Sequence, residues 1–433
     1  MNAELSRNGV SPERHVLVVG GGFGGLAVAQ GLGGIAGIRV TLIDRRNYHL
    51  FQPLFYQVAT SVLSPSEIAE PIRGILRKHA NVTVLLGEVD GVEPERKLVH
   101  LADGGELAYD TLVLATGATH SYFGHSEWAR FAPGLKTLDD ARRIRSSVLL
   151  AFEQAERSSD IDERRRYLTF AVIGGGPTGV EVAGAIAGLA KHALAGEFRN
   201  IDPAEATILL VEAAPRILGA FPENLARYAQ DALSRLGVSV RTGKPVEDIT
   251  EEGLTVGGEV IPAATVIWGA GVQASPVGRW LGLETDRAGH VPVGPDLSVQ
   301  QLDDIYVIGD AALARGEGGQ PLPGLAQVAQ QQGQYLGRAL RDRLLRGQKP
   351  GPFGFRNRGN LAVIGRNAAV VQWDSTQLKG FVAWVFWSVA HVYLLVGFQN
   401  RLFVSLRWLW AYVSKRRGSR IIPESLVRGG NRT

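Results

Sequence analysis

Cysteine is absent from this chain of 433 residues. Its absence excludes disulfide bonds, thiolate metal sites and every mechanism that needs a reactive thiol. An excess of either charge is also lacking, because 46 basic and 42 acidic residues leave a formal net charge of +4. The basic residues are mostly dispersed, and no RNP, zinc or helix-turn-helix pattern is present. We therefore expect no nucleic-acid partner and no bound metal.

The first fifteen residues lack the apolar stretch of a secretory signal and include Glu4 and Glu13. We therefore expect chemistry in the cytoplasm. The length allows two or three domains, and abundant glycine, alanine, valine and leucine favour an α/β core.

Two segments, His15–Gly25 and Thr169–Gly179, each contain a short apolar strand that runs into a GxGxxG pattern. Each is followed by a second apolar strand that ends in an acid, Asp44 in one case and Glu212 in the other. This is the arrangement of a βαβ motif that binds a dinucleotide. The glycines let the backbone approach a pyrophosphate at a helix N-terminus, and the acid accepts hydrogen bonds from a ribose.

Two further apolar strands end in glycine turns, one at Thr116-Gly117 and the other at Gly309-Asp310. Taken alone, Asp310 is more typical of a turn or helix cap. Together with the two βαβ motifs, however, these turns resemble the two-dinucleotide-binding flavoproteins. The resemblance covers about residues 14 to 335 and implies FAD in the first motif and NADH in the second. It implies an α/β fold of two Rossmann-like domains, with the NAD domain inserted in the FAD domain.

The resemblance also implies domain boundaries and cofactor contacts. The expected segments are FAD-binding residues 1–125, NAD-binding residues 126–285, FAD-binding residues 286–345 and a C-terminal membrane-anchoring region, 346–433. The FAD contacts implied are Gly20, Gly21, Gly22, Phe23, Gly24, Gly25, Asp44, Arg45, Thr116, Gly117, Asp310, Ala326 and Gln327. The NAD contacts implied are Gly174, Gly176, Gly179, Glu212 and Gly271.

Within this family, the lack of cysteine excludes disulfide reductases, peroxidases and sulfide:quinone reductases. The remaining acceptors are a quinone, a small redox protein or oxygen. Three segments, Asn47–Ala59, Ala326–Gly333 and Leu361–Arg366, are similar to type II, non-proton-pumping NADH:quinone oxidoreductases. That resemblance implies that Gln327 and Gln331 belong to a quinone pocket. Without the resemblance, the residues favour a polar helix start at the surface.

Three charged residues are candidates for specific roles. Glu181, in the first turns of the helix after the second glycine motif, either stabilises the helix dipole or, as the resemblance implies, acts in catalysis near nicotinamide and quinone. Lys379 either steers a quinone or is an exposed lysine. Glu212 carries negative charge where NADPH would place its 2'-phosphate, so we expect a preference for NADH, although Arg216 is close in sequence.

The C-terminal region is rich in aromatic residues, and residues 380–398 contain no formal charge. In the segment that follows, a helical pattern places six apolar residues on one face: Leu402, Phe403, Leu406, Leu409, Trp410 and Val413. A basic cluster comes next: Lys415, Arg416, Arg417 and Arg420. We expect a peripheral anchor on an anionic membrane surface, at the cytoplasmic face. A spanning helix and a homodimer interface are the alternatives.

These observations predict an FAD-dependent enzyme that passes electrons from NADH to a quinone at a membrane, without proton pumping. The alternative from another class is a soluble NADH-dependent flavin reductase that serves an electron-carrier protein. An NADH sensor that binds both nucleotides and turns over poorly is a third hypothesis.

Overall fold

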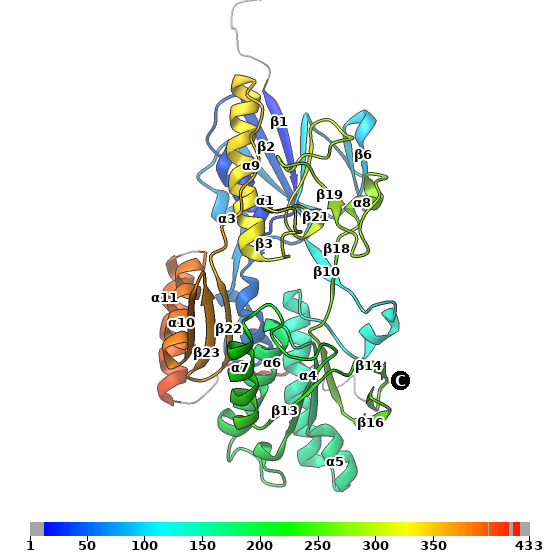
Figure 1. The fold of residues 1–433 in the computed structure, drawn as a ribbon, viewed down its shortest axis with the longest axis vertical. Coiled ribbons are helices and arrows are strands. Elements are labelled where there is room, and N and C mark those ends of the chain that lie inside the picture. The colour runs from blue at the N-terminus through cyan, green and yellow to red at the C-terminus, as the bar shows by residue number, and fades with distance from the viewer. Residues whose placement is uncertain (1–12, 397, 415–418, 425–433) are drawn as a thin grey trace, which may run out of the picture. The chain divides into compact units, whose positions relative to one another are not determined.

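A computed structural model describes residues 13–396, 398–414 and 419–424, which divide into two units (Figure 1). Unit 1 contains the described residues up to Leu50, together with residues 69–119 and 272–357. Unit 2 contains residues 51–68 and 120–271 and the described residues from Arg358 onward. One Rossmann-like fold is therefore inserted in the chain of the other, which confirms the predicted fold class. The domain boundaries proposed from the sequence stay a prediction.

A parallel sheet of five strands forms the centre of unit 1, with the order β20-β9-β1-β2-β5. Its strands are β1 (Arg14–Val19), β2 (Ile38–Asp44), β5 (Val82–Leu86), β9 (Thr111–Leu114) and β20 (Ile305–Val307). The long helices of this unit are α1 (Phe23–Leu32) and α9 (Ala326–Arg346), and Figure 1 shows α9 beside β1 and β2. The shorter elements are β3 (Tyr48–Leu50), β4 (Ala69–Pro71), α3 (Ile72–Leu76), β6 (Val89–Glu93), η3 (Pro94–Arg96), β7 (Leu98–Leu101), β8 (Glu106–Ala108), α8 (Val277–Trp280), β19 (Val291–Pro292), η7 (Gly309–Ala311) and β21 (Ala312–Leu313).

The sheet of unit 1 is covered on both faces, as its central strand shows. Val16 and Val18 of β1 pack with buried residues of α1 and α9, while Leu17 and Val19 pack on the opposite face with residues of β6, β7 and α8. Successive side chains of a strand point to opposite faces, so a sheet covered on both sides requires an uninterrupted apolar run.

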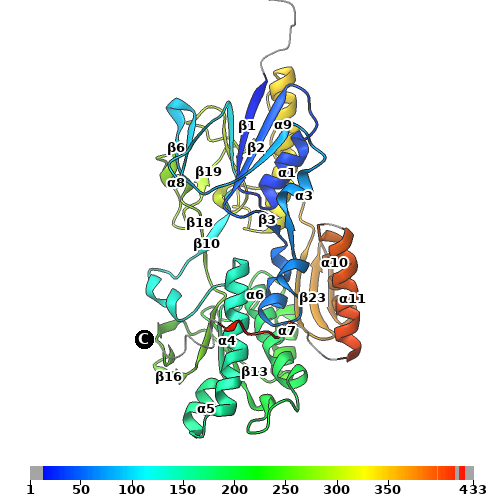
Figure 2. The ribbon, with the colours of Figure 1, turned by 180° about the vertical axis from the view of Figure 1, so that it is seen from behind.

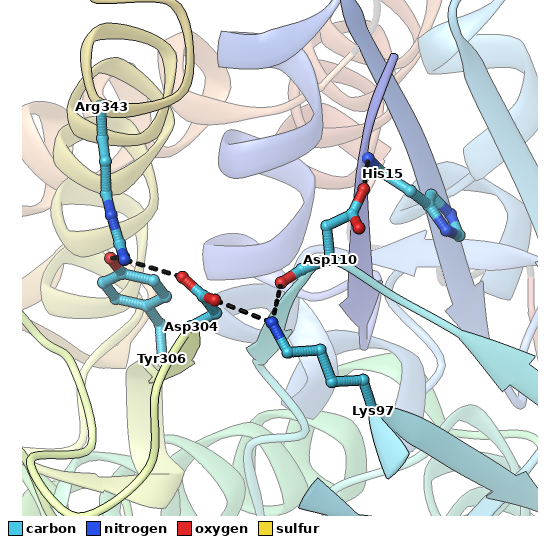
Figure 3. Close-up of polar contacts among 6 residues, drawn as sticks. All are labelled: His15, Lys97, Asp110, Asp304, Tyr306 and Arg343. Carbon is cyan, nitrogen blue, oxygen red and sulfur yellow. Dashed lines mark hydrogen bonds and ion pairs between the residues drawn. The ribbon is translucent and has the colours of Figure 1, made fainter. Parts of the chain in front are cut away.

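A chain of polar contacts ties together the N-terminal ends of several strands in unit 1 (Figure 3). Asp304, which precedes β20, accepts hydrogen bonds from Arg343 of α9 at 2.7 Å and from Lys97 at 2.9 Å. Lys97 also reaches the backbone carbonyl of Asp110, whose carboxylate accepts the backbone N–H of His15. Asp304 adopts a left-handed backbone with φ of 60°, a conformation that aspartate tolerates better than most residues. This network fixes α9 to the N-terminal ends of the strands, whereas the glycine motif follows the C-terminal end of β1.

Unit 2 contains a second parallel sheet, with the order β13-β12-β11-β17. Its strands are β11 (Thr169–Ile173), β12 (Thr207–Glu212), β13 (Val238–Thr242) and β17 (Thr265–Trp268). The long helices near it are α4 (Leu138–Arg157), α6 (Pro177–Gly188) and α7 (Glu223–Arg235). The shorter elements are η1 (Gln52–Leu54), α2 (Phe55–Ala59), η2 (Pro65–Glu67), η4 (Ser126–Arg130), α5 (Ile161–Tyr167), the π-helical turn η5 (Leu189–Ala193), η6 (Pro203–Glu205), β14 (Val246–Ile249), β15 (Gly253–Val256) and β16 (Glu259–Pro262). At the crossings between the units lie β10 (Ala118–His120) and β18 (Val272–Ala274).

The last part of unit 2 is an antiparallel sheet followed by two helices. The strands are β22 (Asn360–Gly365), β23 (Ala368–Trp373) and β24 (Thr376–Gly380), and the helices are α10 (Phe381–Leu394) and α11 (Phe398–Ser414). Figure 2 shows the two helices side by side next to β23. Within the described residues, none of the helices has the length and hydropathy that a membrane crossing requires. In the described part of residues 380–398, the helix α10 has 14 residues, Phe381–Leu394.

Candidate functional site

The first glycine motif closes a tight turn between β1 and α1. Gly20 has φ of 104°, and a Cβ built on Gly25 would lie 1.9 Å from the carbonyl oxygen of Gly20. Only glycine fits at these two positions. A Cβ on Gly22 would meet nothing within 4 Å, so open space borders the N-terminus of α1. This is the environment that a pyrophosphate requires, with backbone N–H groups and the positive end of a helix dipole.

Asp44 holds this turn and also borders a pocket. Its two carboxylate oxygens accept hydrogen bonds from the backbone N–H groups of Gly21 and Arg46, at 2.6 and 2.7 Å. The pocket has a volume of about 390 Å³ and is lined by Gly20, Asp44, Arg45 and Thr116, all predicted FAD contacts. A carboxylate beside a glycine-lined pocket suits the ribose and pyrophosphate of a dinucleotide. These residues fit the adenosine half of FAD.

The remaining predicted FAD residues belong to unit 1 as well. Phe23 lies edge-on to His49, and Gly309-Asp310 begins η7. Ala326 and Gln327 begin α9, and Gly117 has φ of 71° at its turn. The structure places all of them in one unit, and their contacts with FAD stay a prediction.

Two buried residues of unit 1 were missed as site residues. His49 donates a hydrogen bond to the Gly21 carbonyl oxygen, with its Nδ1 at 3.0 Å, and burial lowers the pKa of its imidazole. Gln332 accepts the backbone N–H of Gly309 at 2.6 Å. The sequence drew attention to Gln331, whereas its neighbour Gln332 is the buried glutamine that holds the Gly-Asp turn. Both residues occur in segments that carried the family resemblance.

The second glycine motif repeats the geometry of the first in unit 2. Gly174 has φ of 104°, and a Cβ on Gly179 would lie 1.8 Å from the carbonyl oxygen of Gly174. Glu212 accepts hydrogen bonds from the backbone N–H groups of Gly175 and Ala214 at 2.5 and 2.7 Å. Gly176 is the residue that caps the N-terminus of α6. The NAD motif is therefore shaped for the same kind of ligand.

The guanidinium of Arg216, close to Glu212 in sequence, is hydrogen-bonded to the protein backbone. It donates to the backbone carbonyl oxygens of Phe221 and Gly219, each at 2.8 Å. Gly271, shortly after β17, has φ of 72°, and a Cβ there would collide with the ring of Phe123.

Glu181 lies in α6 and borders a pocket of about 200 Å³ within unit 2. Its carboxylate accepts the backbone N–H of Val363 at 3.3 Å. Burial raises the pKa of Glu181 to about 8, because the single hydrogen bond only partly offsets the loss of hydration. Gly184, one turn further along α6, allows this close packing, since a Cβ there would lie 1.7 Å from the Ile364 carbonyl oxygen.

The other walls of this pocket come from α2, β22, α10 and α11. Tyr56 and Gln57 belong to α2, and Trp384, Trp387 and Trp408 belong to the two C-terminal helices. The pocket is therefore largely aromatic and apolar, with a carboxyl group of raised pKa at its border. Such a cavity suits a flat, apolar ligand that exchanges a proton.

The two glutamines that the sequence analysis assigned to quinone belong to unit 1, and the lysine belongs to β24 of unit 2. Gln331 in unit 1 exchanges two hydrogen bonds with the backbone of Arg356, at 2.9 and 3.0 Å. The side-chain nitrogen of Gln327 lies 3.5 Å from the side-chain oxygen of Asn357. Lys379 is exposed in β24, with its Nζ 5.8 Å from the centre of the Tyr228 ring. None of the three borders the Glu181 pocket, and their roles stay predictions.

The apolar face predicted for residues 401–413 is the exposed face of α11. Its members are Leu402, Phe403, Leu406, Leu409, Trp410 and Val413, and all are between 47% and 71% exposed. Val404 is fully buried on the inner side of the helix. From α10, Phe381, Val382, Val389 and Tyr393 are also more than half exposed. Exposed apolar surface of this size indicates an interaction surface.

The predicted basic cluster is only partly described. Lys415, Arg416 and Arg417 lie outside the described residues. Arg420 pairs with Glu197 at 2.5 Å and donates to the Ala193 carbonyl oxygen at 3.0 Å, at the end of the π-helical turn.

Comparisons with known proteins give a consistent result. A family model described as pyridine nucleotide-disulphide oxidoreductase matches residues 14–333. The type II NADH:quinone oxidoreductase Ndh of Mycobacterium tuberculosis is 42% identical over 429 residues, which cover 95% of this chain and 91% of the relative. NdhA of the same organism, also a type II NADH:quinone oxidoreductase, is 41% identical over 96% of this chain and 91% of its own length.

Solved structures share the fold at lower identity. NDH2 from Plasmodium falciparum, solved in complex with NADH, has a TM-score of 0.86 at 21% identity, with 93% of this chain and 99% of that chain covered. The sulfide:quinone oxidoreductase of Aquifex aeolicus has a TM-score of 0.71 at 17% identity, with coverage of 90% and 91%.

Proposed function

Because the chain belongs to the pyridine nucleotide-disulphide oxidoreductase family, and within it to the type II NADH:quinone oxidoreductases, we propose that it reduces quinone in the pocket bordered by Glu181. The protein is an FAD-dependent enzyme that passes electrons from NADH to a quinone without pumping protons. The soluble reductase for an electron carrier is not favoured. The chemistry that FAD would supply when bound is to accept a hydride and to pass on two electrons.

The residues of the two glycine motifs bind and orient the dinucleotides. Gly20 to Gly25, with Asp44 bonded to the turn, would hold the adenosine diphosphate half of FAD. Gly174 to Gly179, with Glu212 bonded in the same way, would hold that of NADH. Both oxygens of Glu212 are fixed by backbone N–H groups, so its charge stays where a 2'-phosphate would lie. The engagement of Arg216 by two carbonyl oxygens supports a preference for NADH over NADPH.

Quinone reduction needs a proton that NADH does not provide. A hydride carries two electrons and one proton, whereas a quinol has gained two of each, so one proton must come from the protein or solvent. Glu181 is suited to this task, because with a pKa of about 8 its carboxyl group is mostly protonated near pH 7. After it has given its proton away, the carboxylate readily takes up another. This raised pKa in an aromatic pocket is the observation that carries the proposal.

Gln327, Gln331 and Lys379 are proposed to contact the quinone head before it enters the Glu181 pocket, whose lining includes none of the three. An uncharged glutamine can donate to a carbonyl oxygen or accept from a hydroxyl, which suits both quinone and quinol. Lys379 would offer a cation to a quinone oxygen.

Peripheral attachment to a membrane brings the enzyme to its apolar substrate. The exposed apolar side chains of α10 and α11 support an orientation in which both helices lie in the interface. We place this interface at the cytoplasmic face and expect anionic lipid to strengthen binding. A homodimer that covers the same side chains is the competing arrangement.

The proposal is tested with purified full-length protein. It should be yellow from noncovalent FAD, and NADH should bleach the flavin much faster than NADPH. Steady-state rates with a water-soluble quinone and with ferricyanide then separate the two half-reactions. A protein that reduces ferricyanide but no quinone, in the presence or absence of lipid, would contradict the proposal.

A further inference from the structure

Three polar groups in the wall of the Glu181 pocket form an ordered relay. Trp408 of α11 donates its indole N–H to the side-chain oxygen of Gln57 at 2.7 Å. Gln57 in turn donates its amide nitrogen to the hydroxyl oxygen of Tyr56 at 2.8 Å. Gln57 and Tyr56 are only 5% and 7% exposed, and all three residues border the pocket.

The direction of this relay follows from the chemistry of its first member. An indole N–H can only donate, so it faces the oxygen end of the Gln57 amide. The nitrogen end therefore faces Tyr56, whose hydroxyl oxygen has to accept. Once that oxygen accepts from Gln57, the hydroxyl proton is directed away from Gln57. Trp408 thus excludes Gln57 as the acceptor of that proton.

Contacts other than the relay hold Trp408 in place. Its ring packs at 5.5 Å from the ring of Trp387, and the preceding residue, Arg407, pairs with Glu67 at 2.9 Å. Glu67 in turn accepts the backbone N–H of Ser64 at 2.5 Å. Removing only the indole N–H should therefore leave α11 seated while the relay is broken.

We infer that Tyr56 is a catalytic residue that donates a hydrogen bond to a quinone oxygen, and that Gln57 and Trp408 are positioning residues that aim its hydroxyl. The inference rests on the proposed use of this pocket for quinone. A hydrogen-bond donor to a quinone oxygen stabilises the negative charge that develops there as electrons arrive. Glu181 can then supply the proton, while Tyr56 keeps its own.

A double-mutant cycle tests this assignment. Tyr56→Phe removes the hydroxyl group and keeps the ring, whereas Trp408→Phe removes the indole N–H and replaces the indole by a smaller aromatic ring. We expect each to lower kcat/KM for a water-soluble benzoquinone about five- to tenfold and to leave ferricyanide reduction unchanged. Because Trp408 acts only through Tyr56, the double variant should have the same kcat/KM for quinone as Tyr56→Phe alone. Effects that multiply would overturn the inference, as would single variants with wild-type kcat/KM.

Matched controls separate the relay from folding and from the proposed function. Trp373→Phe makes the same change at an indole that is 51% exposed in the same unit, and it should not alter quinone kinetics. If Trp408→Phe loses flavin or thermal stability, Gln57→Met replaces it in the cycle and the same criterion applies. Wild-type protein that reduces no quinone contradicts the proposed function, whereas multiplying effects in an active enzyme contradict only the relay.

Discussion

Glu181→Gln should change both the stability and the kinetics of the enzyme in a pH-dependent way. Burial raises the pKa of this carboxyl from 4.5 to about 8. Between these two values the native protein keeps a proton that the unfolded chain has released, so wild-type stability falls as pH rises. Each pH unit in this interval corresponds to about 1.4 kcal/mol, and the whole interval corresponds to about 5 kcal/mol. Glutamine has no proton to lose and does not carry this cost.

The assay compares apparent unfolding temperatures of the variant and the wild type at about pH 6 and about pH 9. The difference, variant minus wild type, should increase by several degrees toward high pH. The control Glu153→Gln changes an exposed glutamate of α4 in the same unit and should show no such trend. A difference that is the same at both pH values would refute the reasoning, because it would mean that Glu181 is ionised in the native state.

The kinetic counterpart concerns quinone turnover. Wild-type kcat should decline as pH rises through about 8, because the protonated carboxyl is lost. Glu181→Gln should abolish this decline and lower quinone kcat at neutral pH at least several-fold, or roughly 1 kcal/mol in the barrier. Ferricyanide reduction should be unaffected, since that acceptor takes no proton. Wild-type quinone turnover in the variant would return Glu181 to a structural role.

Three other predictions address the nucleotide, the membrane and the fold. Glu212→Ala should raise KM for NADH and lower the ratio of kcat/KM for NADH to kcat/KM for NADPH, because the negative charge and two backbone hydrogen bonds are lost. If this ratio were unchanged, Glu212 would have no part in nucleotide selection. Leu406→Glu with Trp410→Glu should release the protein from anionic vesicles in a sedimentation assay without lowering its unfolding temperature, since both side chains are more than half exposed; retention on vesicles would argue against the anchor. Asp304→Ala should cost about 1 to 3 kcal/mol of stability in denaturant unfolding, because two cations lose their common partner; a cost below this range would show that solvent replaces the pair.

The parts of the molecule that rest on local sequence patterns were predicted correctly. The two βαβ motifs end at Asp44 and Glu212 as expected, because each motif is local in sequence: Asp44 lies 23 positions after Gly21, and Glu212 lies 37 positions after Gly175. The apolar face of α11 was likewise correct, since a helix places its residues by a fixed period. The sequence did not show which side of that helix would pack on the protein.

The pocket wall was missed for a physical reason. Tyr56 and Gln57 lie in the Asn47–Ala59 segment that carried the resemblance, but no local pattern connects them with Trp408. Their contact arises only when α2 and α11 meet. Gln332 was passed over for Gln331 because adjacent residues of a helix differ in burial only through tertiary packing. A single sequence shows neither the long-range pairing nor the buried side of such a helix.

The distance along the chain between Gln57 and Trp408 also has a consequence for biosynthesis. Their hydrogen bond joins residues 351 positions apart. At a translation rate of about 5 to 20 residues per second, α2 waits roughly 20 to 70 s before its partner helix leaves the ribosome. During that time the aromatic residues of the Asn47–Ala59 segment lack the cover that α11 provides. The nascent chain is therefore expected to expose this segment to chaperones, and the Glu181 pocket is expected to form only after α11 has been made.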